Sequence, residues 1–477
     1  MHLMTEPMTE RSPSAASIAV SVSTRLKALP DAAGGAESVR GAAIASRSFI
    51  RSVTRCMDRG DPGMPPIIGC DGGVRGPDVR PAGALGPLAC FAALGVFWGS
   101  WAALIPDIKR QAGASDGELG AAMLVSGVGA ILAMLTVGRI WRHAGWYLLP
   151  ITGLLFAASA LGPAAASSTV ALGAALFLVG AGSGALDVSM NAAVSDVEAS
   201  EGARLMYGAH ALFSLGVLLA SVATGLARQA GAQPWQILAA VALAIALVGL
   251  MTVSTARRRS RITSAAPDPV GSLRVRSSVP GFLVSLAILC AIGYLIEDAA
   301  QNWSALHLER SLGATPALGG AAPGVFAGAM FVGRSLGQRL GSRFSERVLL
   351  SAGAALAAVG LALLAIAPEP ASALTGLAAA GAGIALVAPA LYGRAGRSAS
   401  PAGRGAAIAR LTVFGYTGFI VGPALIGFLS QGFGLRVGIS MLAILAVCLS
   451  IGGAVVLRGP QRVEFSGGEE LLRTGRA

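Results

Sequence analysis

From about residue 84 to residue 457, long apolar stretches follow one another, and ionisable residues are scarce inside them. An apolar stretch of about 20 residues can cross a bilayer as a helix. Hydrophobic residues make up 54% of the chain and charged residues 13%, whereas about a quarter of the residues are charged in ordinary soluble domains. The sequence therefore predicts a polytopic α-helical membrane protein.

The apolar stretches divide into two sets of six, which predicts an all-α fold of twelve transmembrane helices in two pseudo-symmetric halves. The N-terminal half, residues 81–253, contains spans 84–106, 117–138, 146–166, 170–194, 205–228 and 234–253. The C-terminal half, residues 281–457, contains spans 281–304, 318–338, 347–367, 372–394, 405–430 and 436–457. Apart from Arg347 and Arg436, the first residues of the ninth and twelfth spans, the third, sixth, ninth and twelfth spans hold no Asp, Glu, Lys, Arg or His, so we expect them to face lipid.

Three segments lie outside the halves. Residues 1–80 mix Pro, Gly, Ser and Arg with acids and show no periodic apolar face, which predicts a disordered extension. A mis-assigned start codon is the alternative, and no cleaved secretory signal is expected, because no apolar region follows the first basic residues. Residues 254–280 hold six arginines and one aspartate, so we expect a basic linker, and residues 458–477 form a tail.

Glycine patterns repeat between the two halves. The fifth and eleventh spans each have two glycines nine residues apart, and the fourth and tenth spans each contain Gly-Ala-Gly. The matched glycines are Gly216 and Gly225 with Gly418 and Gly427, and Gly180 and Gly182 with Gly381 and Gly383. Together these repeats favour a duplicated bundle, as in secondary transporters built from two related halves.

The net charge of +12 comes from arginines that cluster between the apolar spans. They follow the second, sixth, eighth and tenth spans and recur in the tail, the pattern of cytoplasmic loops. We therefore expect a multi-pass protein of the plasma membrane with both termini in the cytoplasm. This distribution argues against a nucleic-acid partner.

Two neighbouring spans of the N-terminal half carry polar residues at helical spacing. Asp187 and Asn191 share one face of the fourth span, and His210 and Ser214 share one face of the fifth. A charge in hydrocarbon costs about 3 kcal/mol, so it is normally kept where it faces a polar cavity. Asp187 is a candidate proton carrier, or alternatively a structural partner of an arginine or of His210, which is itself a candidate relay or a packing histidine.

The seventh span contains the second polar group, Glu297, Asp298, Asn302 and Trp303. Glu297 lies about 25 Å along the helix from Gly281, which predicts a position in the outer part of the membrane. It is a candidate proton or solute carrier, with exposure at the membrane rim as the alternative. Trp303 is an interface anchor or a solute-stacking ring. In the first span, Trp98 offers a similar surface, for which aromatic packing is the alternative.

Several other functions lack their motifs. No phosphate loop for ATP, HExxH sequence or nucleophile elbow is found, so we expect neither an enzyme nor catalytic residues. The four histidines are far apart and no CxxC pair occurs, so we expect no metal and no cofactor. The expected partners are a small solute, protons and the lipid bilayer, and we expect a monomer.

Four sequence stretches carry a resemblance to a known family. They are GALDVSMN from Gly184, MYGAHALFSLG from Met206, IEDAAQNWSALHL from Ile296 and GYTGFIVGPALIG from Gly415. With twelve spans and a basic middle linker, residues 81–460 resemble the major facilitator superfamily, within it the branch of the rhizopine-transport protein MosC and the YbjJ-type permeases. The resemblance implies alternating access to a central site.

The chain departs from the superfamily pattern in its gating loops and in the seventh span. The loop after the second span, with Gly138, Arg139 and Arg142, lacks the usual acid, as does its counterpart after the eighth span. That counterpart contains Gly337, Arg339 and Arg343. The branch also tends to have an aspartate where this chain has Asn302.

The leading hypothesis is therefore a proton-coupled secondary active transporter. Asp187 and Glu297 are the candidates for proton coupling. The candidates for solute contact are Asn191, His210, Asn302, Trp98 and Trp303. The resemblance implies a sugar-like or inositol-like solute. A drug or metabolite efflux pump of the same fold is the first alternative, and a non-transporting receptor or an intramembrane enzyme is the second. The direction of transport stays open.

Overall fold

The computed structural model describes residues 83–201, 205–260, 281–399 and 404–458, which are almost entirely helical. Among these residues, twelve helical segments are long and apolar enough to cross a membrane, which confirms the predicted fold class. The first six are α3 (Leu85–Gln111), α4 (Asp116–Ala144), η1, α5 and α6 (Gly145–Tyr147, Leu148–Ser159, Gly162–Ala165), α7 (Thr169–Glu201), α8 (Met206–Gln229) and α9 (Pro234–Ser260).

The second six repeat this plan. They are α10 (Gly281–Leu312), α11 (Pro316–Leu340), α12 (Glu346–Ile366), α13 and α14 (Pro370–Ile384, Val387–Ser398), α15 (Arg404–Phe433) and α16 (Leu435–Val456). The predicted extension 1–80, most of the linker and nearly all of the tail fall outside the described residues. Helix α9 continues to Ser260 and so includes residues 254–260 of the segment that we expected to be linker.

Two sequence-based expectations about helix ends are wrong. Helix α10 runs to Leu312, well beyond the predicted limit at residue 304, so Glu297 lies near its middle and not in its outer part. Helix α4 continues to Ala144, so Gly138, Arg139 and Arg142 belong to its last turns and do not form a loop. In the same way, Gly337 and Arg339 belong to the last turn of α11, which ends at Leu340. Both predictions stopped each span at the length needed to cross hydrocarbon, although these helices continue beyond it.

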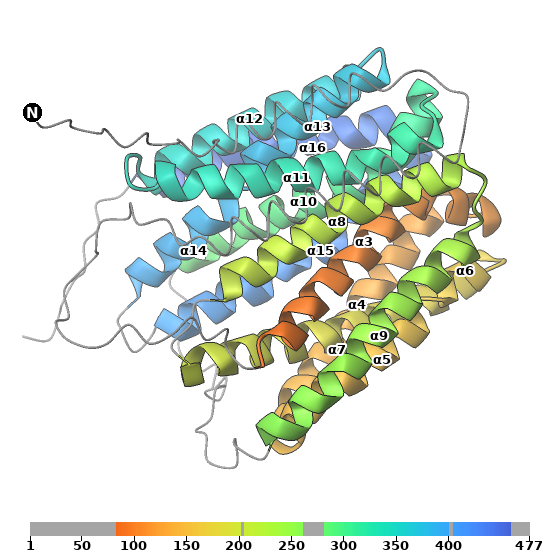
Figure 1. Ribbon diagram of the computed structural model, residues 1–477. Helices are drawn as coiled ribbons and strands as arrows, with labels where there is room; N and C mark the ends of the chain where they lie inside the picture. The colour runs from red at the N-terminus through yellow and green to blue at the C-terminus, as the bar shows by residue number, and fades with distance from the viewer. Residues whose placement is uncertain (1–82, 202–204, 261–280, 400–403, 459–477) are drawn as a thin grey trace, which may run out of the picture. The chain divides into compact units, whose positions relative to one another are not determined.

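The two halves pack their helices in the same way (Figure 1). In each half the first span contacts the fifth, the second contacts the fourth, and the third contacts the sixth. These pairs are α3–α8, α4–α7 and α5–α9 in one half, and α10–α15, α11–α13 and α12–α16 in the other. The main contacts between the halves are α4 with α15 and α8 with α11.

Matched glycines allow the helix backbones to approach closely within each half. A Cβ atom added to Gly216 would lie 2.6 Å from the carbonyl oxygen of Ala92 in α3. At the equivalent Gly418, an added Cβ would lie 2.8 Å from the carbonyl carbon of Ala291 in α10. Both distances are too short for real side chains, so each fifth-position helix needs glycine where it meets the first helix of its half.

The second glycine of each pair lies at the contact between the halves. A Cβ on Gly225 would lie 3.0 Å from the Cα atom of Gly320 in α11. A Cβ on Gly427 would lie 2.9 Å from the Cα atom of Gly120 in α4. The two crossings are therefore equivalent, and both bring the halves into backbone contact.

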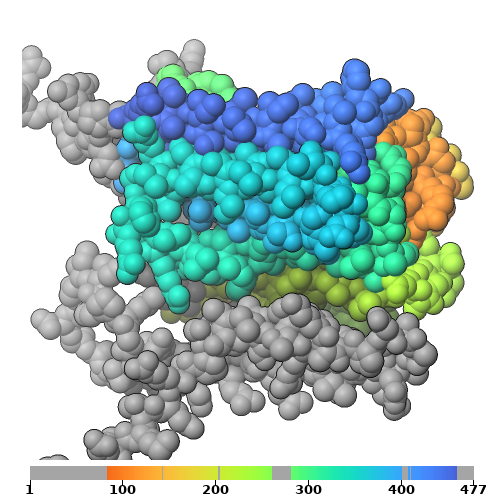
Figure 2. Space-filling model, turned by 90° about the horizontal axis from the view of Figure 1, so that it is seen from above, coloured from red at the N-terminus to blue at the C-terminus, as the bar shows by residue number. Residues whose placement is uncertain are grey.

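The helices whose predicted spans hold no ionisable residue beyond the first position form the outer flanks. In Figure 1, α5 and α9 lie on one flank of the unit of residues 77–477, and α12 and α16 lie on the other. Large apolar side chains are exposed on all four, among them Leu155, Leu243, Val359 and Ile451 at about 60% exposure or more. Figure 2 shows the face made by the C-terminal helices, where the teal and blue segments of the chain lie side by side. In a membrane this surface contacts lipid.

Alanine at the matched glycines should destabilise the fold. We expect Gly216→Ala and Gly418→Ala each to lower the free energy of unfolding by about 1–3 kcal/mol, the usual cost of overpacking. Thermal unfolding in detergent measures this loss. The matched control is Gly173→Ala in α7, where an added Cβ meets nothing within 4 Å. Equal unfolding temperatures for all three variants would show that close packing does not require these glycines.

Candidate functional site

Asp187 lies in the middle of α7 and is partly exposed. Asn191, one turn further on, donates a 3.1 Å hydrogen bond to its carboxylate and a 2.8 Å bond to its backbone carbonyl. Tyr416 of α15 lies close enough to interact electrostatically with Asp187, so this face of α7 is directed toward the other half. Within the described part of the chain, Asp187 has no cationic partner at ion-pair distance, so the alternative of a structural ion pair is not observed.

Glu297 of α10 does have a cationic partner, which the spacing along the sequence did not indicate. Arg334 of α11 donates a 3.3 Å hydrogen bond to the Glu297 carboxylate. The Glu297 side chain is 18% exposed and that of Arg334 39% exposed. His210 of α8 is exposed and lies within electrostatic range of Arg334. Arg334 therefore links an acid of its own half with an imidazole of the other half.

Asp298 starts a separate hydrogen-bonded chain toward α3. Asn302 donates a 3.0 Å hydrogen bond to the Asp298 carboxylate. The side-chain oxygen of Asn302 accepts a 3.2 Å bond from the indole nitrogen of Trp101. Asn302 is buried, and its side chain both donates and accepts. The chain links the first spans of the two halves, α3 and α10.

Two tyrosines form a second polar group beside Glu297. The hydroxyls of Tyr294 and Tyr392 lie 3.1 Å apart, and Tyr392 donates a 3.1 Å bond to Thr412. The ring of Tyr294 stacks on Phe419 at 4.4 Å. Cys290, Tyr294 and Glu297 of α10 lie against the break between α13 and α14.

Among the remaining predicted site residues, Trp303 and Ser214 are buried and Trp98 is partly exposed. Trp303 is fully buried, and its indole nitrogen has no hydrogen-bond partner within the described residues, so it is not available for stacking on a solute in this conformation. Ser214 is also buried. Trp98 is partly exposed and packs edge-to-face against Phe97, while His210 packs edge-to-face against Phe91.

An ion-pair cluster joins the two halves at one end of the bundle. The Arg228 side chain, at the end of α8, is 2% exposed and lies between Asp107 of α3 and Glu309 of α10. Its guanidinium donates two hydrogen bonds to each carboxylate, at 2.6 and 2.9 Å in both cases. Since Asp107 and Glu309 belong to different halves, Arg228 joins the halves through one buried cation.

A second ion pair at the same end also joins the halves. Arg310 of α10 donates two hydrogen bonds of 2.7 and 2.6 Å to Asp116, the first residue of α4. Lys109 lies 3.1 Å from the same carboxylate. Nearby, the side-chain oxygen of Gln431 accepts a 2.9 Å bond from the backbone of Gly117. We call these contacts, together with those of Arg228, the inter-half latch.

The opposite end has a different pattern of ion pairs. In the described part of the chain, Arg259 pairs with Glu201 within the N-terminal half, and Arg397 pairs with Glu346 within the C-terminal half. The exposed side chains of Arg139, Arg339 and Arg343 make no ion pair with any described residue. The side chain of Arg142 is not described. Among the described residues, ion pairs between the halves therefore occur at the end with the latch and not at the opposite end.

Helical spacing did not identify Arg228 and Arg334 as site residues, although the sequence does contain a signal for them. Arg228 ends the predicted fifth span and Arg334 lies inside the eighth, and each is an ionisable residue within an apolar stretch. Three of the chain's five tyrosines lie within spans of the C-terminal half. Their pairing depends on contacts between distant helices, which the spacing along one helix does not reveal.

Comparison with known proteins agrees with this architecture. Residues 287–474 match the family model of the Major Facilitator Superfamily. An MFS-type transporter of Yersinia pestis is 30% identical over 375 residues, which cover 78% of this chain and 94% of the relative. Membrane protein MosC of Rhizobium meliloti is 28% identical, with 76% of this chain and 86% of MosC covered.

Solved structures share the fold. The inward-facing, occupied structure of a bacterial homologue of the human lysosomal transporter Spinster has a TM-score of 0.61 at 14% identity, covering 79% of this chain and 96% of that one. The nucleoside transporter NupG has a TM-score of 0.59 at 14% identity, with 79% and 100% covered.

The fold and these relatives define a multi-pass membrane transporter and not an enzyme. The chain belongs to the major facilitator superfamily.

Removing the latch arginine should open the end that it closes. Arg228→Gln leaves two carboxylates facing each other without their cation, and breaking a buried pair costs about 3–5 kcal/mol. We expect spin labels on Gln233→Cys and Glu369→Cys, exposed residues of the two halves at this end, to move apart. The shift in population should be on the order of a hundredfold or more, since about 1.4 kcal/mol is tenfold.

The matched control is Arg110→Gln. Arg110 pairs with Asp107 within the N-terminal half, and its side chain is 73% exposed. Exposed ion pairs contribute little, so the label distance should not change. An unchanged distance in Arg228→Gln as well would show that the latch does not hold the halves together.

Proposed function

We propose that this chain is a proton-coupled secondary active transporter that moves a small polar solute by alternating access. Two observations together carry the proposal. Asp187 and Glu297 lie near the middle of their helices, and the described ion pairs between the halves, those of Arg228 and Arg310, lie at one end of the bundle. Such an arrangement suits a central site that opens to one side at a time. The protein would lie in the plasma membrane with both termini in the cytoplasm.

The ion pairs support an inward-facing conformation under this orientation. With cytoplasmic termini, the latch of Arg228 and Arg310 lies at the outer end. The arginines Arg139, Arg339 and Arg343, which have no inter-half ion pair in the described part of the chain, lie at the cytoplasmic end. We propose that the segments around Gly138 and Gly337, with Arg142, act as the cytoplasmic gate when that end closes.

Asp187 and Glu297 are the proposed proton carriers, and they differ in their surroundings. A carboxylate without a cation is costly inside a membrane protein, so binding a proton stabilises Asp187. Glu297 faces Arg334, so a proton on Glu297 would release the guanidinium for another partner. Proton binding at Glu297 would thereby change the charge available to a solute. Asp298 is held by Asn302 and is assigned a structural role in this conformation.

The proposed solute is polar and rich in hydroxyl groups, such as a sugar or an inositol. The accessible groups of the candidate site include an amide, an imidazole and a tyrosine hydroxyl, from Asn191, His210 and Tyr294. These groups both donate and accept hydrogen bonds, as recognition of a polyol requires. The broken span α13–α14 beside Glu297 adds support, since discontinuous helices commonly form transporter sites.

Proteoliposomes with an imposed pH gradient test the proposal. A panel of labelled polyols and sugars should include a solute that accumulates about tenfold per pH unit for one coupled proton. Glu297→Gln should abolish accumulation while retaining exchange of labelled for unlabelled solute, because exchange needs the site but no net proton movement. Asp187→Asn should behave in the same way if both acids carry protons.

The matched control is Glu369→Gln, an exposed acid in the turn before α13 that should leave accumulation unchanged. Accumulation that persists in both Glu297→Gln and Asp187→Asn would contradict proton coupling through these acids. A panel in which no solute shows flux in the parent protein would remove the support for a polyol. A gradient-driven loss of solute from the vesicles would instead favour the efflux alternative.

A further inference from the structure

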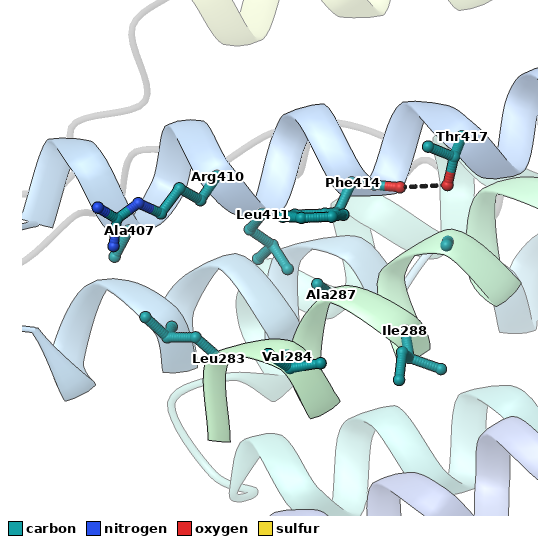
Figure 3. Close-up of a pocket in the computed structure, with 10 residues that line it drawn as sticks. Leu283, Val284, Ala287, Ile288, Ala407, Arg410, Leu411, Phe414 and Thr417 are labelled. Carbon is teal, nitrogen blue, oxygen red and sulfur yellow. Dashed lines mark hydrogen bonds between the residues drawn. The ribbon is translucent and has the colours of Figure 1, made fainter. Parts of the chain in front are cut away.

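We propose that the seam between α10 and α15 binds one anionic phospholipid. A groove of about 210 Å³ lies between the first half of each helix, with Val284 and Ile288 on one wall and Leu411 and Phe414 on the other. Figure 3 shows these side chains between the two helices, with Arg410 at one end of the set. The groove is smaller than the roughly 300–1,000 Å³ of pockets that enclose a drug-sized ligand. It fits a segment of a long ligand, as an acyl chain would offer.

The groove lies on the opposite side of both helices from the candidate transport site. On α10, Ile288 and Glu297 are nine residues apart, which at about 3.6 residues per turn places them roughly 180° apart. On α15, Phe414 and Tyr416 are two residues apart, about 200° around the helix. Because Glu297 and Tyr416 belong to the transport site, Ile288 and Phe414 face away from it.

Three apolar side chains of the groove walls are exposed, as a lipid-facing surface requires, whereas Leu411 is buried. The exposed fraction is 45% for Val284, 56% for Ile288 and 52% for Phe414. Thr417 is the one hydroxyl residue among those that line the groove, and its hydroxyl donates a 2.6 Å bond to the carbonyl of Phe414. Its polarity is therefore satisfied within α15, and the groove presents hydrocarbon to its surroundings.

Arg410 gives the groove its preference for negative charge. Arg410 lies six residues, or about 9 Å, from the start of α15 at Arg404, and Phe414 and Thr417 lie farther along the helix. We therefore place the guanidinium of Arg410 at headgroup level, with Phe414 and Thr417 beside the hydrocarbon. Basic residues between transmembrane helices at the membrane surface bind anionic headgroups. An acyl chain along the seam and a phosphate at Arg410 therefore use the two ends of one site. Under the proposed orientation, this site lies in the cytoplasmic leaflet.

Quenching of an introduced tryptophan by brominated lipid tests the site without a transport assay. Phe414→Trp places a reporter on the groove wall, and Ile288→Trp provides a second reporter on the other helix. The purified full chain is placed in phosphatidylcholine vesicles with a minor fraction of brominated phosphatidylglycerol or of brominated phosphatidylcholine. The signal of the native tryptophans, measured in the parent protein, is subtracted.

We expect brominated phosphatidylglycerol to occupy the groove about fivefold more than brominated phosphatidylcholine, the effect of one arginine near the surface. Arg410→Gln should equalise the two lipids, whereas Arg347→Gln, at the start of the span formed by α12, should not. A Leu243→Trp reporter on α9, 61% exposed on the other half, should show no preference.

Equal quenching of both groove reporters by the two lipids would overturn the proposal. Absence of quenching by either lipid would also overturn it, because another protein surface, such as a second copy of the chain, would then cover the groove. The transport proposal does not depend on either result.

Discussion

The buried guanidinium of Arg228 is the interaction on which the rest of this conformation depends. It pairs with one carboxylate from each half, Asp107 and Glu309, so separating the halves would break at least one buried ion pair. Losing one partner of a buried pair is far more costly than breaking an exposed one. The ion pairs therefore join the halves at the latch end, and under the proposed function the central acids are reached from the other end.

Backbone contact at matched glycines joins the two halves at two equivalent crossings. Gly225 meets Gly320 at one crossing and Gly427 meets Gly120 at the other. Backbone meets backbone at these points, so under the proposed alternating access the helices could rotate about them with little change in side-chain packing. The two pairs are related by the internal duplication, so both crossings have the same glycine-to-glycine contact. The latch lies near these contacts, where a small rotation would separate its charges.

The fold could be predicted well from the sequence because the governing constraint is local. Long apolar stretches identify spans one at a time, and the repeat of Gly216 and Gly225 at Gly418 and Gly427 indicates the duplication. Prediction was weaker at helix ends, where α4 and α10 continue past the hydrocarbon.

The candidate site could be predicted only in part. Asp187 and Glu297 stand out because they are acids within apolar stretches, but Trp303 was expected at a solute site and is a buried ring in the structure. The cationic partner of Glu297, Arg334, comes from another helix, as does Arg228, the partner of Asp107. Hydrophobic periodicity describes one helix at a time and carries no information about such pairings.

The most direct test of a central site that opens at one end is to measure from which side of the membrane position 191 is accessible to water. A single cysteine in place of Asn191, in a chain without its native cysteines, would be exposed to a membrane-impermeant thiol reagent in vesicles of each orientation. We expect labelling in inside-out vesicles and protection in right-side-out vesicles, because the latch closes the outer end. Equal labelling from both sides, or none from either, would contradict a central site open to one side.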